Sequence, residues 1–205
     1  MSEFSKAALV IGAGDATGGA IARRFAREGF ATCVVRRHAD QLAPLVDSIR
    51  ASGGAAHPYG VDARDEAAVV AMVDAIERDV GAIEVYVFNI GANVPASILE
   101  ETSRKFFKIW EMACLAGFLT AREVARRMVV RGRGTMLFTG ATASLRGSTH
   151  FAAFAGAQHA VPSPAPSMAR APRPHGSHVT TVVSRGAPDD RLTPTHVAHR
   201  HAPRR

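Results

Sequence analysis

Short apolar runs alternate with longer amphipathic segments over the first 160 residues of the chain. The runs are rich in aliphatic and β-branched residues, which is typical of strands buried on both faces of a sheet. The predicted strands are Ala7–Ile11, Thr32–Val35, Ala56–Gly60, Val85–Phe88 and Thr135–Phe138. The segments between them predict helices near 17–28, 39–52, 65–80, 102–130 and 152–160.

This alternation predicts an α/β fold of Rossmann type, a doubly wound parallel sheet with helices on both faces. Asp65 stands where it can cap the third helix. Four glycines stand where helix C-termini need a left-handed residue, namely Gly29, Gly53, Gly81 and Gly132. We expect one dinucleotide-binding domain over residues 1–190, patterned best up to about residue 160.

The pattern changes after residue 160, where eight of the eleven prolines lie. Prolines crowd residues 162–174 and exclude a helix there, because each one removes a hydrogen bond and clashes with the preceding turn. A strand is expected at His178–Val183, and the C-terminal part is otherwise irregular or truncated. Residues 191–205 predict a disordered basic tail.

Composition places the chain among globular proteins, with 47% hydrophobic residues. No apolar run approaches the roughly 20 residues that span a bilayer, and the N-terminus lacks a signal-peptide pattern. We therefore expect a cytoplasmic protein that does not bind a membrane. Cys33 and Cys114 lie far apart in apolar segments, which predicts buried free thiols and no metal site.

The formal net charge of +7 belongs mainly to the C-terminal segment. Residues 161–205 contain 7 of the 25 Lys and Arg but only 2 of the 18 Asp and Glu. That segment has no aromatic residue on which a base would stack. We therefore expect no nucleic-acid partner.

A glycine-rich turn follows the first predicted strand and leads into a helix. It runs Gly12-Ala13-Gly14-Asp15-Ala16-Thr17-Gly18. Glycines let backbone N–H groups approach an anion closely, and the helix N-terminus adds partial positive charge. The turn predicts a phosphate-binding site, although its spacing is one residue wider than the dinucleotide fingerprint.

Further motifs stand at the ends of the later strands. Arg36-Arg37 follows the second strand, Val61-Asp62 the third, Asn89-Ile90-Gly91 the fourth, and Thr139-Gly140-Ala141-Thr142-Ala143-Ser144 the fifth, with Phe154-Ala155-Gly156-Ala157-Gln158 soon after. With the glycine turn, this set over residues 1–160 resembles the short-chain dehydrogenase/reductase family. The resemblance implies an oxidoreductase that transfers hydride between a nicotinamide cofactor and a carbonyl or alcohol.

The resemblance also implies roles for the cofactor-binding positions. Gly12, Gly14 and Gly18 match the phosphate-binding glycines, with Asp15, Ala16 and Thr17 between them and Ala16 in place of the middle glycine. Arg36 and Arg37 stand where an acidic residue would bind a ribose 2′-hydroxyl. Since Arg accommodates a 2′-phosphate, they favour NADP over NAD. Asp62 matches the adenine-contacting aspartate, and Asn89 and Gly91 match an element that supports the sheet and lines the cleft.

The four catalytic positions of the family are all substituted. Phe154 replaces the proton-transferring tyrosine and has no proton to give, and Gln158 replaces the lysine that lowers the phenol pKa and holds the nicotinamide ribose. The serine position aligns with Ala141, with Thr142 and Ser144 close by, and Cys114 stands at the asparagine position. Nearby His150 and His159 are interpreted as surface residues.

Two functions follow: an NADP-dependent oxidoreductase acting on a small molecule, or a non-catalytic NADP-binding or interaction protein on the same fold. Two origins of the C-terminal departures also stay open: natural divergence, or an error in the sequence after about residue 157 in which single bases are replaced by cytosine. The 102–130 segment, with residues such as Phe107 and Trp110, has more apolar surface than one sheet face needs. It predicts a homodimer or homotetramer, and a buried helix of a monomer would show the same pattern.

Overall fold

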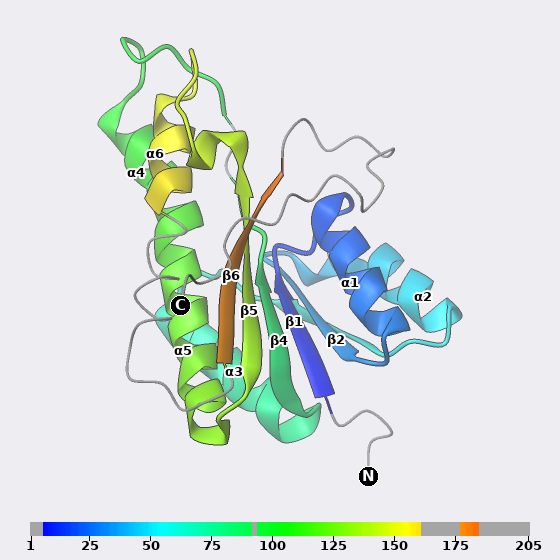
Figure 1. Cartoon of the computed structure of the whole chain (residues 1–205). Coiled ribbons are helices and arrows are strands. Elements are labelled where there is room, and N and C mark those ends of the chain that lie inside the picture. The colour runs from blue at the N-terminus through cyan, green and yellow to red at the C-terminus, as the bar shows by residue number, and fades with distance from the viewer. Residues whose placement is uncertain (1–5, 92–93, 161–176, 185–205) are drawn as a thin grey trace.

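A computed structural model describes residues 6–91, 94–160 and 177–184 of the chain. Its centre is a parallel six-stranded sheet in the order β3-β2-β1-β4-β5-β6 (Figure 1). The strands are β1 (Lys6–Ile11), β2 (Ala31–Arg36), β3 (Ala56–Gly60), β4 (Ala82–Phe88), β5 (Gly134–Ala141) and β6 (Ser177–Ser184). The predicted α/β fold is confirmed, and so is the sixth strand expected at His178–Val183.

Helices cover both faces of this sheet (Figure 1). One face carries α1 (Thr17–Arg27) and α2 (Ala43–Ala51), the latter preceded by the short 3₁₀ turn η1 (Ala39–Leu42). The other face carries α3 (Glu66–Asp79) and α5 (Ala116–Arg131). Near the carboxyl ends of β4 and β5 lie α4 (Ser103–Trp110), the 3₁₀ turn η3 (Thr142–Ser144) and α6 (Ala152–Ala160).

Alternating side chains of the strands build two separate hydrophobic cores. On β1, Leu9 and Ile11 point into the core under α3 and α5, together with the aromatic rings of Tyr86, Phe88 and Phe138. The intervening Ala8 and Val10 point into the core under α1 and α2. Because every β1 residue from 7 to 11 is buried, the run reads as continuously apolar, as a central parallel strand requires.

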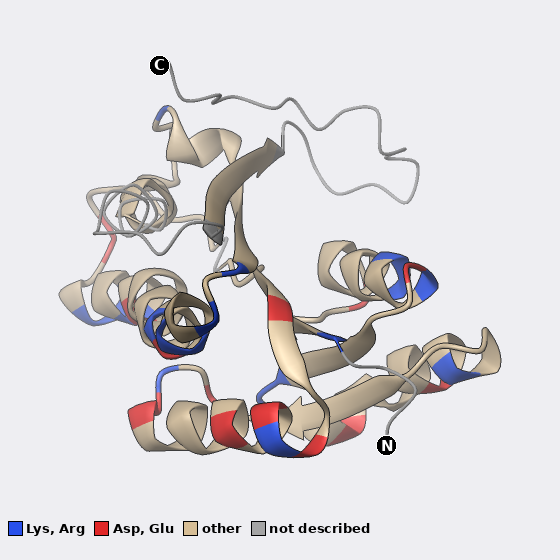
Figure 2. Cartoon of the chain, turned by 60° about the horizontal axis from the view of Figure 1, so that its bottom comes forward, with Lys and Arg blue, Asp and Glu red and all other residues tan. Residues whose placement is uncertain are grey.

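Acidic residues of α3 lie opposite basic residues of α5 (Figure 2), and ion pairs between them join the two helices on their face of the sheet. The pairs Glu66–Arg122, Asp74–Arg127 and Glu77–Arg131 run along the two helices, the last with 2.7 Å between Glu77 Oε2 and Arg131 Nη1. Arg131 also donates to the carbonyl of Ile83 at 2.8 Å. These contacts fix α5 against the sheet, and α5 in turn continues from the segment that borders the cleft.

The predicted single helix over 102–130 is wrong in one respect, because five of its residues form a π-helical turn. This turn, η2 (Glu111–Leu115), joins α4 to α5 and contains Cys114. The predicted cap of the third helix is confirmed, since the Asp65 side chain accepts from Ala68 N at 3.0 Å. Gly29, Gly53 and Gly132 have the expected left-handed φ, whereas Gly81, with φ +146°, lies in a more extended region.

The two thiols differ in burial. Cys33 is fully buried in β2, as predicted, but Cys114 is only partly buried, because the π turn places it towards the edge of the core. Over the described ranges, no helix is long and apolar enough to cross a membrane. The predicted absence of a helix over 162–174 and the predicted tail at 191–205 lie outside the described residues.

Candidate functional site

The carboxyl ends of β1, β2, β3, β4 and β5 meet at one edge of the sheet, and the glycine turn crosses this edge after β1. The N–H groups of Gly12 and Ala13 both donate to the carbonyl of Val35, at 3.0 and 3.1 Å, which folds the turn back over β2. Gly12 has a left-handed φ of +81°, and a Cβ there would lie 2.7 Å from the carbonyl oxygen of Asn89. Only glycine fits this position.

Gly14 and Gly18 are required for different reasons. A Cβ on Gly18 would overlap the carbonyl oxygen of Gly12 and lie 2.9 Å from Ala13 Cα, so this glycine allows α1 to pack against the turn. A Cβ on Gly14 would meet no atom of the described residues within 4 Å, and its φ is not positive. Neither backbone strain nor packing within the described residues requires a glycine at position 14.

The start of α1 offers unpaired donors to an anion. Among the described residues, none accepts a hydrogen bond from the backbone N–H groups of Asp15, Ala16, Thr17 or Gly18. The N-cap residue Ala16 has no side chain to satisfy them, and the first turn holds no acidic residue. A helix start without an acidic or hydroxyl cap keeps its positive end available for a phosphate.

Asn89 ties β1, β4 and β5 together beneath this turn. Its backbone N–H donates to the Ile11 carbonyl at 2.9 Å, and its side-chain Nδ2 donates to the Gly12 carbonyl at 3.1 Å. The Thr139 hydroxyl contacts Asn89 Oδ1 at 2.9 Å and the Phe88 carbonyl at 3.1 Å. The structure therefore places Asn89 at the sheet edge, and it adds Thr139, whose role was not predicted.

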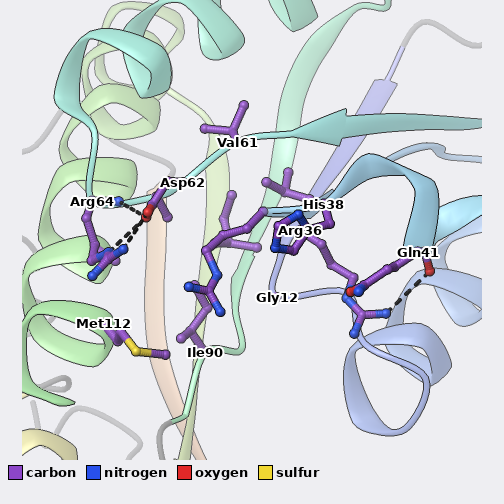
Figure 3. A pocket seen from close by; sticks show the side chains of 14 residues that line it. Gly12, Arg36, His38, Gln41, Val61, Asp62, Arg64, Ile90 and Met112 are labelled. Carbon is purple, nitrogen blue, oxygen red and sulfur yellow. Dashed lines mark hydrogen bonds and ion pairs between the residues drawn. The ribbon is translucent and has the colours of Figure 1, made fainter. Parts of the chain in front are cut away.

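A cavity of about 180 Å³ opens between the ends of β1, β2 and β3 (Figure 3). Its lining carries three arginines and one aspartate, namely Arg36, Arg37, Arg64 and Asp62. His38 and Gln41 add polar groups on the β2 side, while Ile90 and Met112 add apolar surface on the β4 side. A cavity with one cationic wall and one apolar wall suits a ligand that carries both an anionic group and a flat apolar ring.

The two adjacent arginines at the end of β2 form the cationic wall. Arg36 Nη1 lies 3.4 Å from Asp15 Oδ1 and 3.3 Å from the Gln41 carbonyl oxygen, which turns its guanidinium towards the glycine turn (Figure 3). Both contacts are long, and the Asp15 side chain is 90% exposed. Arg37 is exposed at the cavity and contributes to lowering the pKa of Asp62.

Asp62 is held by Arg64, two residues further along the chain (Figure 3). The Arg64 side chain donates to both carboxylate oxygens, from Nε at 3.0 Å and from Nη2 at 2.6 Å, and its backbone N–H donates at 3.1 Å. These hydrogen bonds lower the pKa of Asp62 to about 2. The sequence prediction for Asp62 missed this partner, whose only signal was an arginine at a spacing of two in a loop.

The substituted catalytic positions gather at the ends of β4 and β5. Gly91 faces two of them, because a Cβ there would lie 3.8 Å from Phe154 Cε2 and 3.9 Å from Gln158 Nε2. The Phe154 ring packs edge-on against Phe151, with 6.4 Å between ring centroids. α6 therefore places an aromatic ring and a buried amide beside Gly91, and neither group is a strong acid or base.

The two hydroxyl groups after β5 have different surroundings. Ser144, which is buried, accepts from the N–H of Ala141 at 3.1 Å and donates to Gln158 Oε1 at 3.3 Å. A Cβ on Gly140 would lie 2.7 Å from Ser144 Oγ, so Gly140 leaves the space that this hydroxyl fills. Thr142 opens η3 and is partly exposed. Ser144, not Thr142, is therefore the hydroxyl bound to α6.

Cys114 and the two histidines complete the surroundings of this region. Burial raises the pKa of the Cys114 thiol, which lies in the π-helical turn η2. His150 and His159 are exposed, as predicted, and His159 Nδ1 lies 2.8 Å from the Ala155 carbonyl oxygen of its own helix. Within the described parts of the chain, no three His, Cys, Asp or Glu side chains gather as a metal site.

Comparison with protein families gives one match that spans most of the chain. A family model described as short chain dehydrogenase matches residues 6–188. The matched segment begins with β1 and extends past β6, so it contains the glycine turn, the cavity and the α6 region.

Solved structures with the same fold extend this match. A short-chain dehydrogenase from Rhodopseudomonas palustris is 48% identical, with a TM-score of 0.83 over 87% of this chain and 84% of that chain. A gluconate 5-dehydrogenase from Burkholderia cenocepacia J2315, in complex with NADP and tartrate, is 27% identical, with a TM-score of 0.82 over 89% and 71% of the two chains. An NAD⁺-bound xylitol dehydrogenase is 26% identical, with a TM-score of 0.82 over 90% and 72%.

The similar proteins differ in length and in cofactor. The chain spans 59% and 51% of the lengths of the first two curated relatives that it matches. One of the two complexes above contains NADP and the other contains NAD⁺. Likeness to these two proteins therefore does not favour NADP over NAD.

Proposed function

We propose, since the chain belongs to the short-chain dehydrogenase family, that it binds NADP(H) in this cleft and transfers hydride between the cofactor and a carbonyl or alcohol substrate. The observation that carries the proposal is the cavity wall formed by Arg36 and Arg37 at the end of β2. A ribose 2′-phosphate is a dianion, and guanidinium groups bind phosphate in a fork geometry. An NAD-binding site has a carboxylate in this place instead.

The residues present fit the parts of NADP(H) in order along the sheet edge. Gly14 and the free N–H groups at the start of α1 take the pyrophosphate, and Arg36 and Arg37 take the 2′-phosphate. Asp62 takes the adenine ring, and Gly91 leaves room beside the nicotinamide end. When bound, the cofactor supplies the hydride, so the protein contributes binding, orientation and proton transfer.

Proton transfer is the weakest part of this assignment, and the side chains explain why. Phe154 has no acidic proton, and Gln158 carries no charge with which to lower a neighbouring pKa. Gln158 is buried and its Oε1 is bound to Ser144, so only Nε2, beside Gly91, is left as the donor that would replace the family's lysine at the nicotinamide ribose. Thr142 is the hydroxyl left to orient a substrate carbonyl, because Ser144 is bound to Gln158. We expect solvent to supply the proton and turnover to be slow.

The same observations favour a second candidate, a non-catalytic NADP-binding or interaction protein. In that case the groups around the phosphates and adenine would be retained for binding, while Cys114, Ala141, Phe154 and Gln158 would do no chemistry. Fold alone does not decide between these functions, because short-chain dehydrogenase chemistry depends on the substituted positions.

Measuring cofactor binding and turnover separately tests the proposal. NADPH binding is measured by isothermal titration calorimetry, and NADPH oxidation is followed at 340 nm with a panel of aliphatic, cyclic and aromatic carbonyls. Binding with slow oxidation supports the enzyme, whereas binding without oxidation across the panel supports the non-catalytic candidate. Absence of NADPH binding would reject both.

We extend the proposal to assembly, location and domain organisation. Four aromatic side chains of the α4–α5 segment are 37–62% exposed, namely Phe106, Phe107, Trp110 and Phe118, and this surface supports a homodimer or homotetramer. Leu119, by contrast, is buried. The free thiols Cys33 and Cys114 support a reducing compartment such as the cytoplasm. We treat residues 1–190 as one domain.

A further inference from the structure

The Asp62–Arg64 pair lies in the cavity wall, and its hydrogen bonds leave little of the carboxylate unused. Oδ1 accepts from Arg64 Nε and from the Arg64 backbone N–H, while Oδ2 accepts from Arg64 Nη2. An ionised carboxylate has about two acceptor sites on each oxygen. Oδ1 is therefore fully occupied, and Oδ2 keeps one site.

Arg64 is itself fixed from a second side. Its Nη1 lies 3.9 Å from Glu111 Oε2, which belongs to the π-helical turn η2 beside the cavity. Met112, the next residue of that turn, also lines the cavity near Arg64 (Figure 3). The guanidinium thus spans from the loop after β3 to η2, and it cannot swing away from Asp62 without breaking both contacts.

The charges around Asp62 keep it ionised. Arg64 lies on its own loop and Arg37 lies at the end of β2, and both lower its pKa, while Glu111 on η2 faces Arg64. A carboxylate in this state accepts hydrogen bonds and donates none. Its remaining acceptor site therefore favours an N–H group and repels a carbonyl oxygen.

We propose that Arg64 is a positioning residue that fixes Asp62 with one open acceptor site, so that the cavity selects a 6-aminopurine over a 6-oxopurine. The inference rests on the proposed NADP(H) site. It adds Arg64, which acts on the ligand only through Asp62. The Arg64 guanidinium holds the carboxylate in place, and the carboxylate reads the exocyclic amino group of adenine.

The test compares NADP⁺ with its hypoxanthine analogue, in which an oxygen replaces that amino group. Dissociation constants are measured by calorimetry for the wild-type chain and for Arg64→Ala, Arg64→Lys, Asp62→Ala and the Asp62→Ala/Arg64→Ala double variant. One hydrogen bond to a charged group corresponds to about 10- to 100-fold in affinity, so we expect the wild-type chain to prefer NADP⁺ by about that factor. Arg64→Ala reduces the preference to within about threefold, and Arg64→Lys does not restore it, because an ammonium lacks the fork geometry.

Arg78→Ala is the matched control. Arg78 forms an equivalent two-pronged pair with Asp79, with both N–O distances 2.7 Å, at the far end of α3 outside the cavity. This variant should keep the wild-type preference. Circular dichroism of every variant separates lost selectivity from lost folding, and Arg64→Lys keeps the positive charge if Arg64→Ala does not fold.

Three results distinguish the inference from its rivals. If Arg64→Ala weakens both dinucleotides equally, or if the double variant binds NADP⁺ more weakly than Asp62→Ala, Arg64 contacts the ligand directly and the inference is wrong. If Arg64→Ala changes the ratio of NADP⁺ to NAD⁺ affinity, Arg64 binds the 2′-phosphate, which also overturns it. If the wild-type chain binds neither dinucleotide, the proposed function fails instead.

Discussion

The carboxyl ends of β1, β2 and β3 and those of β4 and β5 form two halves of one sheet edge, and they carry different chemistry. The first half has charged and hydrogen-bonding groups around a cavity, with Arg36, Arg37 and the Asp62–Arg64 pair in its wall. The second half presents Phe154 and the neutral amide of Gln158. In the proposed NADP(H) site, cofactor binding and proton transfer therefore depend on separate sets of residues. One set can be replaced while the other is kept.

The sheet between the halves is held by contacts that the catalytic substitutions do not touch. Asn89 and Thr139 join β1, β4 and β5 through the carbonyls of Ile11, Gly12 and Phe88. In the second half, the Ser144 hydroxyl fills the space above Gly140 and bonds to Gln158. The substituted region is therefore packed and hydrogen-bonded without the groups that do chemistry in the family.

Restoring the missing groups gives the largest expected effect. Phe154→Tyr combined with Gln158→Lys supplies a phenol and a cation on one face of α6, and general acid catalysis contributes about 10²- to 10⁴-fold. We expect NADPH oxidation on the carbonyl panel to rise by about that factor. Independently of any substrate, ultraviolet titration should show the new phenol ionising below its ordinary pKa of about 10, because a nearby ammonium favours the phenolate.

Phe151→Tyr combined with Gln158→Lys is the control for that experiment. Phe151 packs against Phe154, with 6.4 Å between the ring centroids. The control therefore adds the same two groups but places the phenol on the neighbouring ring. It should gain no activity. An equal gain in both variants would mean that the site at residues 154 and 158 does not define the chemistry.

Substitution of the two turn glycines separates folding from binding within the first half. Gly18→Ala forces a methyl group into the Gly12 carbonyl and should lower the free energy of unfolding by about 3 kcal/mol. Gly14→Ala meets no described atom within 4 Å, so it should leave stability unchanged or raise it by up to about 1 kcal/mol. Urea denaturation measures both changes.

The Gly14→Ala variant also tests whether the cofactor lies close to the backbone of the glycine turn. Gly14→Ala should weaken NADPH binding at least about tenfold, equivalent to about 1.4 kcal/mol, because its methyl group occupies the space that the pyrophosphate needs. A stable Gly14→Ala variant with wild-type affinity would show that the pyrophosphate does not approach this turn.

The third prediction concerns the choice of cofactor. Arg36→Ala combined with Arg37→Ala removes two charged donors and should weaken NADPH binding by about 10- to 100-fold while leaving NADH binding nearly unchanged. Arg24→Ala is the control, since Arg24 pairs with Glu28 on the exposed side of α1. An equal loss for NADPH and NADH would contradict a 2′-phosphate site at the end of β2.

The smallest expected effect compares the two thiols. Burial raises the pKa of the Cys33 thiol to about 12, so it stays protonated at pH 8 and is also inaccessible. Cys114 is partly exposed, and its raised pKa slows its reaction without preventing it. A thiol reagent should therefore label one equivalent per folded chain at pH 8, at a rate that rises with pH. Rapid labelling of two equivalents would show that the β2 core opens.

Much of this architecture was predictable from the sequence, because the apolar runs are short and the glycines mark the ends of the helices between them. Residues 7–11 of β1 and 85–88 of β4 are all buried, so these apolar runs can be recognised without knowledge of their neighbours. The π-helical turn Glu111–Leu115 was not predictable in this way. A shift from i+4 to i+5 hydrogen bonds changes the register of the helix by one residue and leaves its amphipathic pattern almost intact.

Within the candidate site, positions were easier to predict than partners. The glycine turn, Arg36 and Asn89 lie at strand ends, where the order of parallel strands brings them to one edge. The partner of Asp62 was missed because Arg64 looks like an ordinary loop charge until its side chain folds back. Thr142 and Ser144 are chemically similar, and only the turn of η3 decides which of them reaches Gln158.

We propose that the first half of this sheet edge holds NADP(H) although the second half lacks the family's catalytic groups. Titration of the wild-type chain with NADPH and with NADH, under identical conditions, tests it most directly. We expect saturable NADPH binding that is at least about tenfold tighter than NADH binding, because a 2′-phosphate gains charged hydrogen bonds from Arg36 and Arg37. Equal affinities, or no binding of either dinucleotide, would contradict it.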